Sequence, residues 1–145
     1  MKNKINITEA ITQKEKLECF NIRFEVFVNE QGVPKEIELD EFDRNSFHAL
    51  ARINNKPLGT GRLIYLDAEN AKIGRMAVYL DYRKIGIGGL ILDLLEKKAK
   101  NKRVKHLTLN AQEYISKFYS KHGYSQKGTV FLEAGIPHIK MDKKI

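Results

Sequence analysis

The sequence predicts a single α/β domain with a mixed sheet, and three observations support this fold class. The chain has 145 residues, 42% hydrophobic and 30% charged, which suits one core and is too short for two ordinary domains. Short alternating segments typical of strands are interspersed with segments of helical periodicity. No repeat, low-complexity tract or flexible linker divides the chain. We therefore expect residues 1–145 to form one domain with the element order β-α-β-β-β-α-β-α-β-β.

The first two elements are predicted to be a strand and a helix. Residues 4–8 alternate like a short strand. The segment Thr12-Gln-Lys-Glu15 has the capping-box pattern that begins a helix. The apolar residues expected to pack into the core from this helix are Leu17, Phe20, Phe24 and Phe27.

A long acidic loop and three strands should follow. Periodicity is lost over 29–45, and a loop of this length in a compact domain is often functional. Segments 47–53 and 58–66 alternate on either side of an Asn-Asn-Lys-Pro turn and predict a hairpin. Residues 71–79 predict the third strand of this group.

The C-terminal half begins with an amphipathic helix. Its apolar residues follow the i, i+3, i+4, i+7, i+8 spacing of one buried face: Ile87, Leu90, Ile91, Leu94 and Leu95. Beyond it we expect a strand over 104–111, a helix over 113–121 that ends at Gly123, and two strands broken at Gly135-Ile136-Pro137.

Charge and composition restrict the class of protein. The net charge is +8, yet Glu25–Asp43 is strongly acidic and should attract a cation, whereas Arg83–Lys105 is basic and should attract an anion. The alternative, equally compatible with charge alone, is that both stretches are solvated faces. No apolar run reaches the roughly 18 residues of a membrane span, and the start lacks a signal sequence, so we expect a soluble, cytoplasmic protein. Cys19 alone cannot form an internal disulfide, and the four histidines have no zinc-site spacing, so no metal is expected.

A glycine-rich turn between a strand and a helix is the most informative motif. It reads Arg83-Lys84-Ile85-Gly86-Ile87-Gly88-Gly89. Such a turn lets successive backbone N–H groups point at a phosphate, and the start of the helix adds unpaired donors. The alternative is a tight turn without a ligand, but the two cations and the basic helix favour phosphate.

Two familiar nucleotide loops are excluded by what the turn lacks. A Walker loop ends in Gly-Lys-Ser/Thr, whereas Gly89-Leu90 follows Gly88 here. A dinucleotide fingerprint needs a third glycine where Ile91 stands.

The turn resembles the acyl-CoA pyrophosphate loop of the GNAT N-acetyltransferases. The resemblance is carried by Arg83-x-x-Gly86-x-Gly88, by Leu109-Asn-Ala-Gln112 and by Phe118-Tyr-Ser-Lys-His-Gly-Tyr124. Val26-Phe27-Val28-x-Glu30-Gln31-x-Val33-Pro34 and Ala134-Gly-Ile-Pro-His138 are similar to the ElaA/YjcF-like branch of that family. The resemblance covers essentially the whole chain. It implies a mostly antiparallel mixed sheet with helices on both faces.

The resemblance also implies acetyl-CoA as cosubstrate. The pyrophosphate would be held by backbone N–H groups of Lys84, Ile85, Gly86, Ile87, Gly88 and Gly89, with the cations of Arg83 and Lys84 alongside. The main chain of Met76, Ala77 and Val78 would pair with the pantetheine arm. Asn110 would contact the same arm, although a turn-capping role fits it equally well.

Tyr119 corresponds to the family's tyrosine near the CoA sulfur, which protonates the departing thiolate. The alternative role, a core aromatic residue, fits Phe118 better. The group that deprotonates the amine stays open among Glu30, Asp43, His48, Glu133 and His138, with His138 and Glu30 expected on the acceptor side. Cys19 lacks a neighbour that would activate a thiol, so a packed thiol is favoured over an acyl carrier.

The predicted function is transfer of an acetyl group to a primary amine through a ternary complex. The acceptor is a small molecule or a peptide that the sequence does not identify, and the acidic loop should face its amine. Two alternatives are a CoA-binding protein without catalysis and a basic nucleic-acid-binding module. The second lacks the aromatic residues expected of a strand-binding surface, so neither nucleic acid nor membrane is the expected partner. The oligomeric state stays open, with a homodimer as one form.

Overall fold

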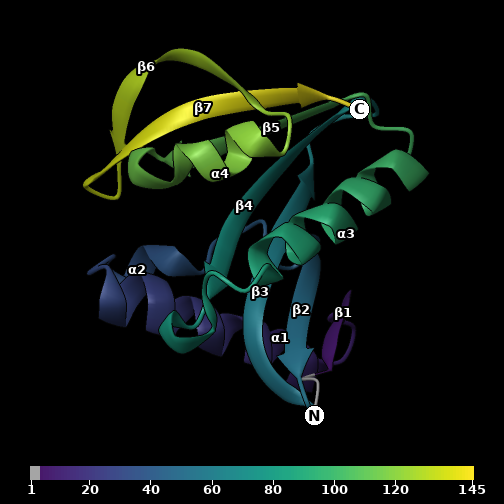
Figure 1. Cartoon of the computed structure of the whole chain (residues 1–145), viewed down its shortest axis with the longest axis vertical. Helices are drawn as coiled ribbons and strands as arrows, with labels where there is room; N and C mark the ends of the chain where they lie inside the picture. Colours follow the sequence, from purple (N-terminus) through teal and green to yellow (C-terminus); the bar gives the residue numbers. More distant parts are fainter. Residues whose placement is uncertain (1–3) are drawn as a thin grey trace.

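The computed structural model describes residues 4–145 and has one seven-stranded sheet with helices on both faces (Figure 1). The strand order is β1-β2-β3-β4-β5-β7-β6, and the β4–β5 pair alone is parallel. The strands are β1 (Ile5–Glu9), β2 (Phe47–Ile53), β3 (Lys56–Tyr65), β4 (Asn70–Val78), β5 (His106–Gln112), β6 (Ser125–Glu133) and β7 (Ile136–Lys144). The main helices are α1 (Gln13–Arg23), α2 (Lys35–Glu38), α3 (Ile87–Asn101) and α4 (Ser116–Lys121). The predicted fold class is confirmed, and the predicted elements occur in the predicted order. The short helix α2 is additional and lies within residues 29–45, which were expected to form a loop.

Helix α1 begins where the capping box predicts, but it buries a partly different face. Thr12 Oγ1 accepts from Glu15 N at 3.1 Å, and Glu15 Oε1 accepts from Thr12 N at 3.0 Å. Leu17, expected in the core, is 51% exposed, whereas Cys19, Ile22 and Val26 are buried. Phe20 and Phe27 are partly buried and pack against this cluster, so the predicted face is confirmed in part, with its centre at Cys19, Ile22 and Val26 and with Leu17 outside it. After Arg23 the chain continues as a π-helix, η1 (Phe24–Glu30).

The β2–β3 hairpin and the irregular pairing of β3 with β4 shape the sheet next to the site. Asn54 and Asn55 both have positive φ, at 49° and 68°, as a tight two-residue hairpin turn requires. Between β3 and β4 the register shifts, so that Thr60 pairs with Ala77 while Arg62 pairs with Gly74. This bulge leaves Arg75 at φ 52°.

Helix α3 packs closely against β3 because of a glycine. A β-carbon on Gly61 would lie 2.7 Å from both Ile91 Cγ2 and Met76 Sδ. The apolar face of α3 predicted from the sequence is buried at Ile87, Ile91 and Leu95, whereas Leu90 is 42% exposed. The opposite face of the sheet is covered by α1, so α3 and α1 enclose β3 between them (Figure 1).

The parallel pair β4–β5 is joined over only half its length. Residues Asn70–Ile73 pair with His106–Leu109, and no pairing follows, although β4 continues to Val78 and β5 to Gln112. The two strands therefore diverge in the middle of the sheet. This divergence positions the site described below.

The C-terminal strands extend the sheet beyond β5. The predicted helix over 113–121 consists of a 3₁₀ turn, η3 (Glu113–Ile115), followed by α4. The turn between β6 and β7 lies at Ala134 and Gly135, so Ile136 and Pro137, expected to break the strands, belong to β7. Within residues 4–145, no helix is long and apolar enough to cross a membrane.

Candidate active site

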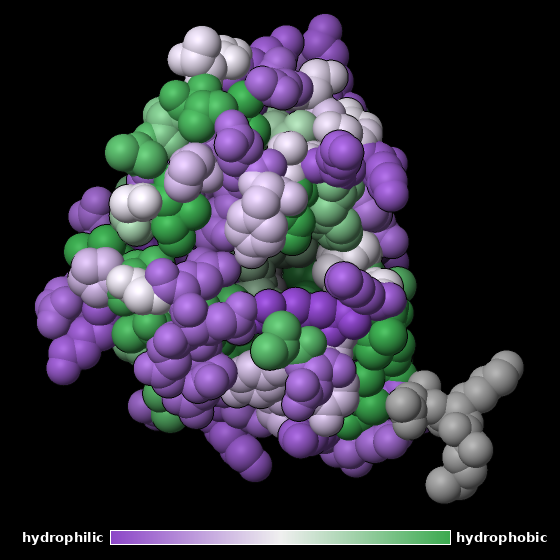
Figure 2. Space-filling model, turned by 60° about the vertical axis from the view of Figure 1, so that its left-hand side comes forward, coloured by the Kyte–Doolittle hydropathy of each residue, from purple (hydrophilic) through white to green (hydrophobic). Residues whose placement is uncertain are grey.

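A cavity of about 1230 Å³ lies where β4 and β5 diverge. Its walls come from both strands, from the glycine turn before α3, and from the segment between Val26 and Phe42. Figure 2 shows a hollow with hydrophobic surface at its bottom and hydrophilic side chains around it. The opening in the sheet therefore gives ligands access to the main chain of both strands.

The glycine turn forms one end of the cavity. Lys84 and Gly86 have positive φ, at 66° and 92°, which turns the chain sharply into α3. The first backbone bond of the helix is donated by Leu90 N to Gly86 O at 3.2 Å, so the preceding N–H groups are the unpaired donors of a helix start. A β-carbon on Gly88 would meet only the Phe118 ring, at 3.4 Å. This end can therefore bind an anion through its backbone.

Most residues predicted to bind the cofactor line the cavity, and two do not. The side chain of Ile85 is 53% exposed and lies outside it. Gly89 also lies outside, and its α-carbon faces His122, whose Nε2 would be 3.2 Å from an added β-carbon. The cavity-lining members of the set are Met76, Ala77, Val78, Arg83, Lys84, Gly86, Ile87, Gly88 and Asn110.

Arg83 forms an ion pair that the sequence did not indicate. Its Nη1 and Nη2 each lie 2.7 Å from a carboxylate oxygen of Glu30, and its Nε donates to Val78 O at 2.7 Å. Glu30, expected on the acceptor side, therefore contacts the turn before α3 and does not line the cavity. The pair is partly exposed, so its strength depends on salt.

Tyr119 lies on α4 and lines the cavity although only 7% of it is exposed. Burial raises the pKa of its phenol well above the usual range, so the hydroxyl keeps its proton at neutral pH. The ring packs edge-on against Phe118 and Tyr124. A packed ring that presents a protonated hydroxyl to a cavity can donate a proton there.

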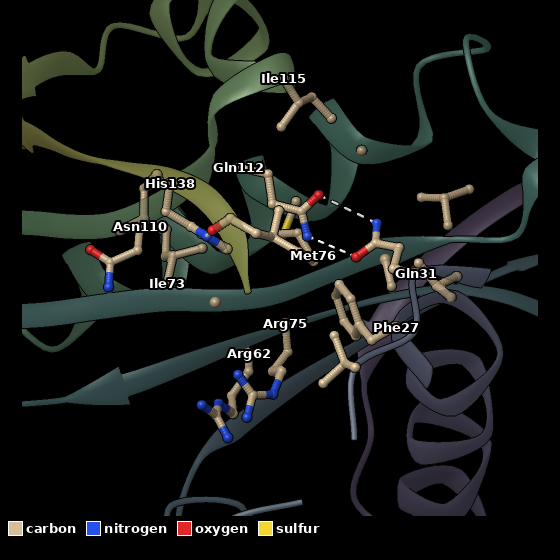
Figure 3. Close-up of a pocket in the computed structure, with 18 of the residues that line it drawn as sticks. Phe27, Gln31, Arg62, Ile73, Arg75, Met76, Asn110, Gln112, Ile115 and His138 are labelled. Atoms are coloured by element: carbon tan, nitrogen blue, oxygen red, sulfur yellow. Dashed lines mark hydrogen bonds between the residues drawn. The ribbon is translucent and has the colours of Figure 1, made fainter. Parts of the chain in front are cut away.

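Three predicted polar residues come together on the β5–β7 side of the cavity. Asn110 Nδ2 donates to Glu133 Oε1 at 3.1 Å, and Glu133 Oε2 lies 3.5 Å from His138 Nε2. The other ring nitrogen of His138, Nδ1, is 2.6 Å from Ile136 O, which fixes the ring. Figure 3 shows Asn110 and His138 next to each other at the cavity. A carboxylate next to an imidazole can accept a proton.

The other candidate proton acceptors are engaged elsewhere. Burial acts to raise the pKa of Asp43, but hydrogen bonds from Arg23 and the Asp40 backbone lower it to about 2. His48 is buried outside the cavity, and burial lowers its pKa. Cys19 is buried, with its thiol next to Ala49 O, and burial raises the pKa of this thiol to about 11. The thiol is therefore protonated at neutral pH and packs as a core side chain.

The two acids of the acidic loop that line the cavity, Glu38 and Asp40, are both in ion pairs. Together with Asp43 they pair with three arginines from α1, β3 and β4. We call this group the arginine–carboxylate cluster; its members are Arg23, Arg62, Arg75, Glu38, Asp40 and Asp43. Four of the seven acids between Glu25 and Asp43 are therefore paired within the fold, whereas Glu25, Glu36 and Glu41 form no ion pair with residues 4–145. The attraction of this segment for a cation stays a prediction.

A pair of amides also crosses the cavity wall, and the sequence gave no indication of it. Gln112 Nε2 donates to Gln31 Oε1 at 2.8 Å, and Gln31 Nε2 donates back to Gln112 Oε1 at 3.3 Å (Figure 3). The pair joins the loop after η1 to the end of β5.

The arginine–carboxylate cluster had one signal in the sequence. Arg62 and Arg75 stand in the middle of predicted strands, and a buried guanidinium needs acidic partners.

Among residues 4–145, no group of three or more His, Cys, Asp or Glu side chains is arranged to hold a metal ion.

The chain is similar in sequence to a known family and to curated proteins. The family model described as "Acetyltransferase (GNAT) domain" matches residues 8–145. YjcF of Bacillus subtilis strain 168, described as an uncharacterized N-acetyltransferase, is 41% identical over 137 residues, which cover 92% of this chain and 96% of the relative.

Solved structures share the fold. Escherichia coli ElaA matches with a TM-score of 0.83 and 25% identity over 98% of this chain and 99% of its own. A GNAT family acetyltransferase from Elizabethkingia anophelis, solved with acetyl-CoA bound, matches with a TM-score of 0.75 and 22% identity over 99% and 100% of the two chains.

Proposed function

Since the chain belongs to the GNAT acetyltransferase family, we propose that it transfers an acetyl group from acetyl-CoA to a primary amine by direct attack in a ternary complex. The observation that carries the proposal is the cavity between the diverging strands β4 and β5. It is lined by an anion-binding turn, a buried tyrosine and an acid–imidazole pair. Acetyl-CoA supplies the acetyl group as a thioester.

The turn before α3 would hold the pyrophosphate. Its positive-φ residues and the open space at Gly88 leave backbone N–H donors at the cavity surface. Hydrogen bonds from such donors to a charged phosphate are stronger than hydrogen bonds between neutral groups. Lys84 adds a charge beside them. Arg83 would stabilise the turn through its hydrogen bonds to Glu30 and to Val78 O. Its positive charge would also attract the pyrophosphate at longer range. The free edges of β4 and β5, at Met76, Val78 and Asn110, would receive the pantetheine amides.

Tyr119 would protonate the leaving thiolate. Its hydroxyl forms no hydrogen bond with residues 4–145, so nothing in that part of the chain competes for its proton. The raised pKa of the phenol keeps this proton in place at neutral pH, so the hydroxyl is in its acid form when the thioester bond breaks.

Glu133 and His138 would receive the proton of the amine, directly or through water. They are the members of the candidate set that line the cavity, and Asn110 fixes the carboxylate of Glu133. Asp43, His48 and Glu30 are occupied by the contacts described above. Since Cys19 is a buried thiol with a raised pKa, transfer through a cysteine acyl-enzyme has no suitable nucleophile at that position.

The test is release of CoA from acetyl-CoA in the presence of a panel of primary amines, with the product amide identified by mass spectrometry. We expect CoA and amide in equal amounts. Thermal stabilisation by acetyl-CoA without amide formation from any amine would support the CoA-binding alternative instead. A gel shift with DNA and RNA, in the same buffer, tests the nucleic-acid alternative.

A further inference from the structure

We propose that the amine acceptor also carries a carboxylate, and that Arg62, Arg75 and Lys72 bind it. This inference rests on the proposed function and names the class of its acceptor. The three side chains lie on one wall of the cavity, on β3 and β4. Figure 3 shows the guanidinium groups of Arg62 and Arg75 side by side, away from the Gln31–Gln112 pair.

The arginines of the cluster differ in how many of their donors are used. Arg23 uses all three nitrogens, donating to Glu38 from Nε and to Asp43 from Nη1 and Nη2. Arg62 donates only from Nη1, to Asp40 at 2.7 Å and Asp43 at 3.0 Å. Its Nε is buried without a partner in residues 4–145, although only 5% of the residue is exposed. A buried donor without a partner costs about 1–3 kcal/mol, so a ligand that supplies an acceptor is favoured here.

Two of the three carboxylates of the cluster, Asp40 and Asp43, have no comparable capacity left. Asp40 Oδ1 accepts from Arg62 and from Phe42 N, and its Oδ2 accepts from Arg75. Both oxygens of Asp43 accept bonds from Arg23. Glu38 Oε2 accepts from Arg23 Nε and lies 3.0 Å from Arg75 Nε, whereas its Oε1 has no hydrogen bond with residues 4–145. The fully buried polar atom of the cluster that lacks a partner is the donor Arg62 Nε, which suits an anion.

The net charge of the wall also favours a single negative charge. In the cluster, the charges of three arginines and three carboxylates cancel. Lys72 lies on β4 two residues before Gly74, which pairs with Arg62, so Lys72 and Arg62 share one face of the sheet. Lys72 has no ion pair among residues 4–145 and leaves the wall with one positive charge. A carboxylate matches this charge, whereas a phosphate dianion would exceed it.

The position of the wall suits an amino acid or a short peptide. Arg62 is on β3, and Asn110, which holds Glu133, is on β5, so one strand separates them. Two spacings between paired strands amount to about 10 Å, and the divergence of β4 from β5 begins at this level, so the span is at least that long. The long side chains reach inward from one side and shorten it. An amine near Glu133 and His138 and a carboxylate near Arg62 would then fit in one small molecule.

The first experiment varies the acceptor and leaves the protein unchanged. For several amino acids, kcat/KM is measured for the free acid, its primary amide and its decarboxylated amine, with CoA release as the readout. We expect the free acid to exceed both neutral forms by about 10- to 100-fold, the value of a hydrogen bond to a charged group. Equal values for the acid and its neutral forms would overturn the inference and leave the proposed function intact. An aminoalkylphosphonate that exceeds the carboxylate would overturn it in favour of a dianion.

The second experiment changes the wall. Lys72→Met should lower kcat/KM for the amino acid and leave its decarboxylated amine unchanged, with Lys140→Met, an exposed lysine on β7 outside the cavity, as the matched control. An equal fall for both acceptors would indicate a structural effect and contradict the role.

A binding readout keeps the inference testable if no acceptor is turned over. The melting temperature with 3-phenylpropionate should exceed that with 3-phenylpropanol in the wild-type protein, and Lys72→Met should reduce the difference. No difference would count against the carboxylate site, whereas missing turnover alone would count against the proposed function.

Discussion

The two ends of the cavity are built in different ways. At the α3 end, a continuous stretch from Arg83 to Gly88 presents backbone donors at positions with positive φ or without a side chain. At the opposite end, side chains from several strands, from α1 and from the acidic loop meet. Charges are matched there in the arginine–carboxylate cluster, and Glu133 on β6 lies next to His138 on β7. Because the α3 end binds through the backbone, its ligand contacts depend little on which side chains are present. At the opposite end the contacts come from side chains, so single substitutions can change which ligand binds there.

Tyr119→Phe gives the largest expected effect, because Tyr119 lines the cavity that both ends share. Removing the hydroxyl keeps the packed ring and should lower turnover by roughly 10²–10⁴-fold, the usual range for general acid catalysis. Acetyl-CoA affinity and melting temperature should change little. A smaller fall, with chemistry shown to limit the rate in single-turnover experiments, would mean that water or another group supplies the proton.

Arg23→Met tests whether the arginine–carboxylate cluster is needed for folding. It leaves Glu38 and Asp43 buried without their main partner, so the free energy of unfolding should fall by about 3–5 kcal/mol in denaturant titrations. Arg83→Met is the matched control. Because its ion pair with Glu30 is partly exposed, we expect a loss below about 1 kcal/mol. Similar losses for the two variants would show that the buried cluster contributes no more to stability than the partly exposed Arg83–Glu30 pair.

Gly88→Val tests the backbone end alone. An added β-carbon meets only the Phe118 ring at ordinary contact distance, so the fold should tolerate it. The side chain would occupy the space next to the backbone donors and weaken acetyl-CoA binding by about 10- to 100-fold, measured by calorimetry. Unchanged affinity in the folded variant would mean that the turn only connects β4 to α3.

Glu30→Gln separates the two ends. On sequence grounds Glu30 belonged to the acceptor side, but its carboxylate binds Arg83 at the turn. The substitution should therefore change the Michaelis constant of acetyl-CoA and not that of the amine, by up to about 5-fold, the value of a partly exposed ion pair. A change confined to the amine constant would return Glu30 to the acceptor side.

The same contrast explains what could be predicted from the sequence. The order of elements, the hairpin at Asn54–Asn55 and the capping box at Thr12 depend on local patterns, and they were predicted. The glycine turn was also found because its residues are consecutive. The cluster depends on contacts between Arg23, the loop and β3–β4, and no local pattern encodes which charges meet. The buried face of α1 was predicted only in part: Phe20 and Phe27 pack against the core, but Leu17 is exposed while Cys19 and Ile22 are buried, which depends on how the helix is rotated against the sheet.

The central claim is that both substrates occupy this one cavity together, and two-substrate initial-rate kinetics test it most directly. With acetyl-CoA and the amine varied against each other, the account predicts intersecting lines in double-reciprocal plots. It also predicts no mass gain when the protein is incubated with acetyl-CoA alone. Parallel lines, together with a protein that gains the mass of one acetyl group before the amine is added, would contradict direct transfer and place an acyl-enzyme on the reaction path.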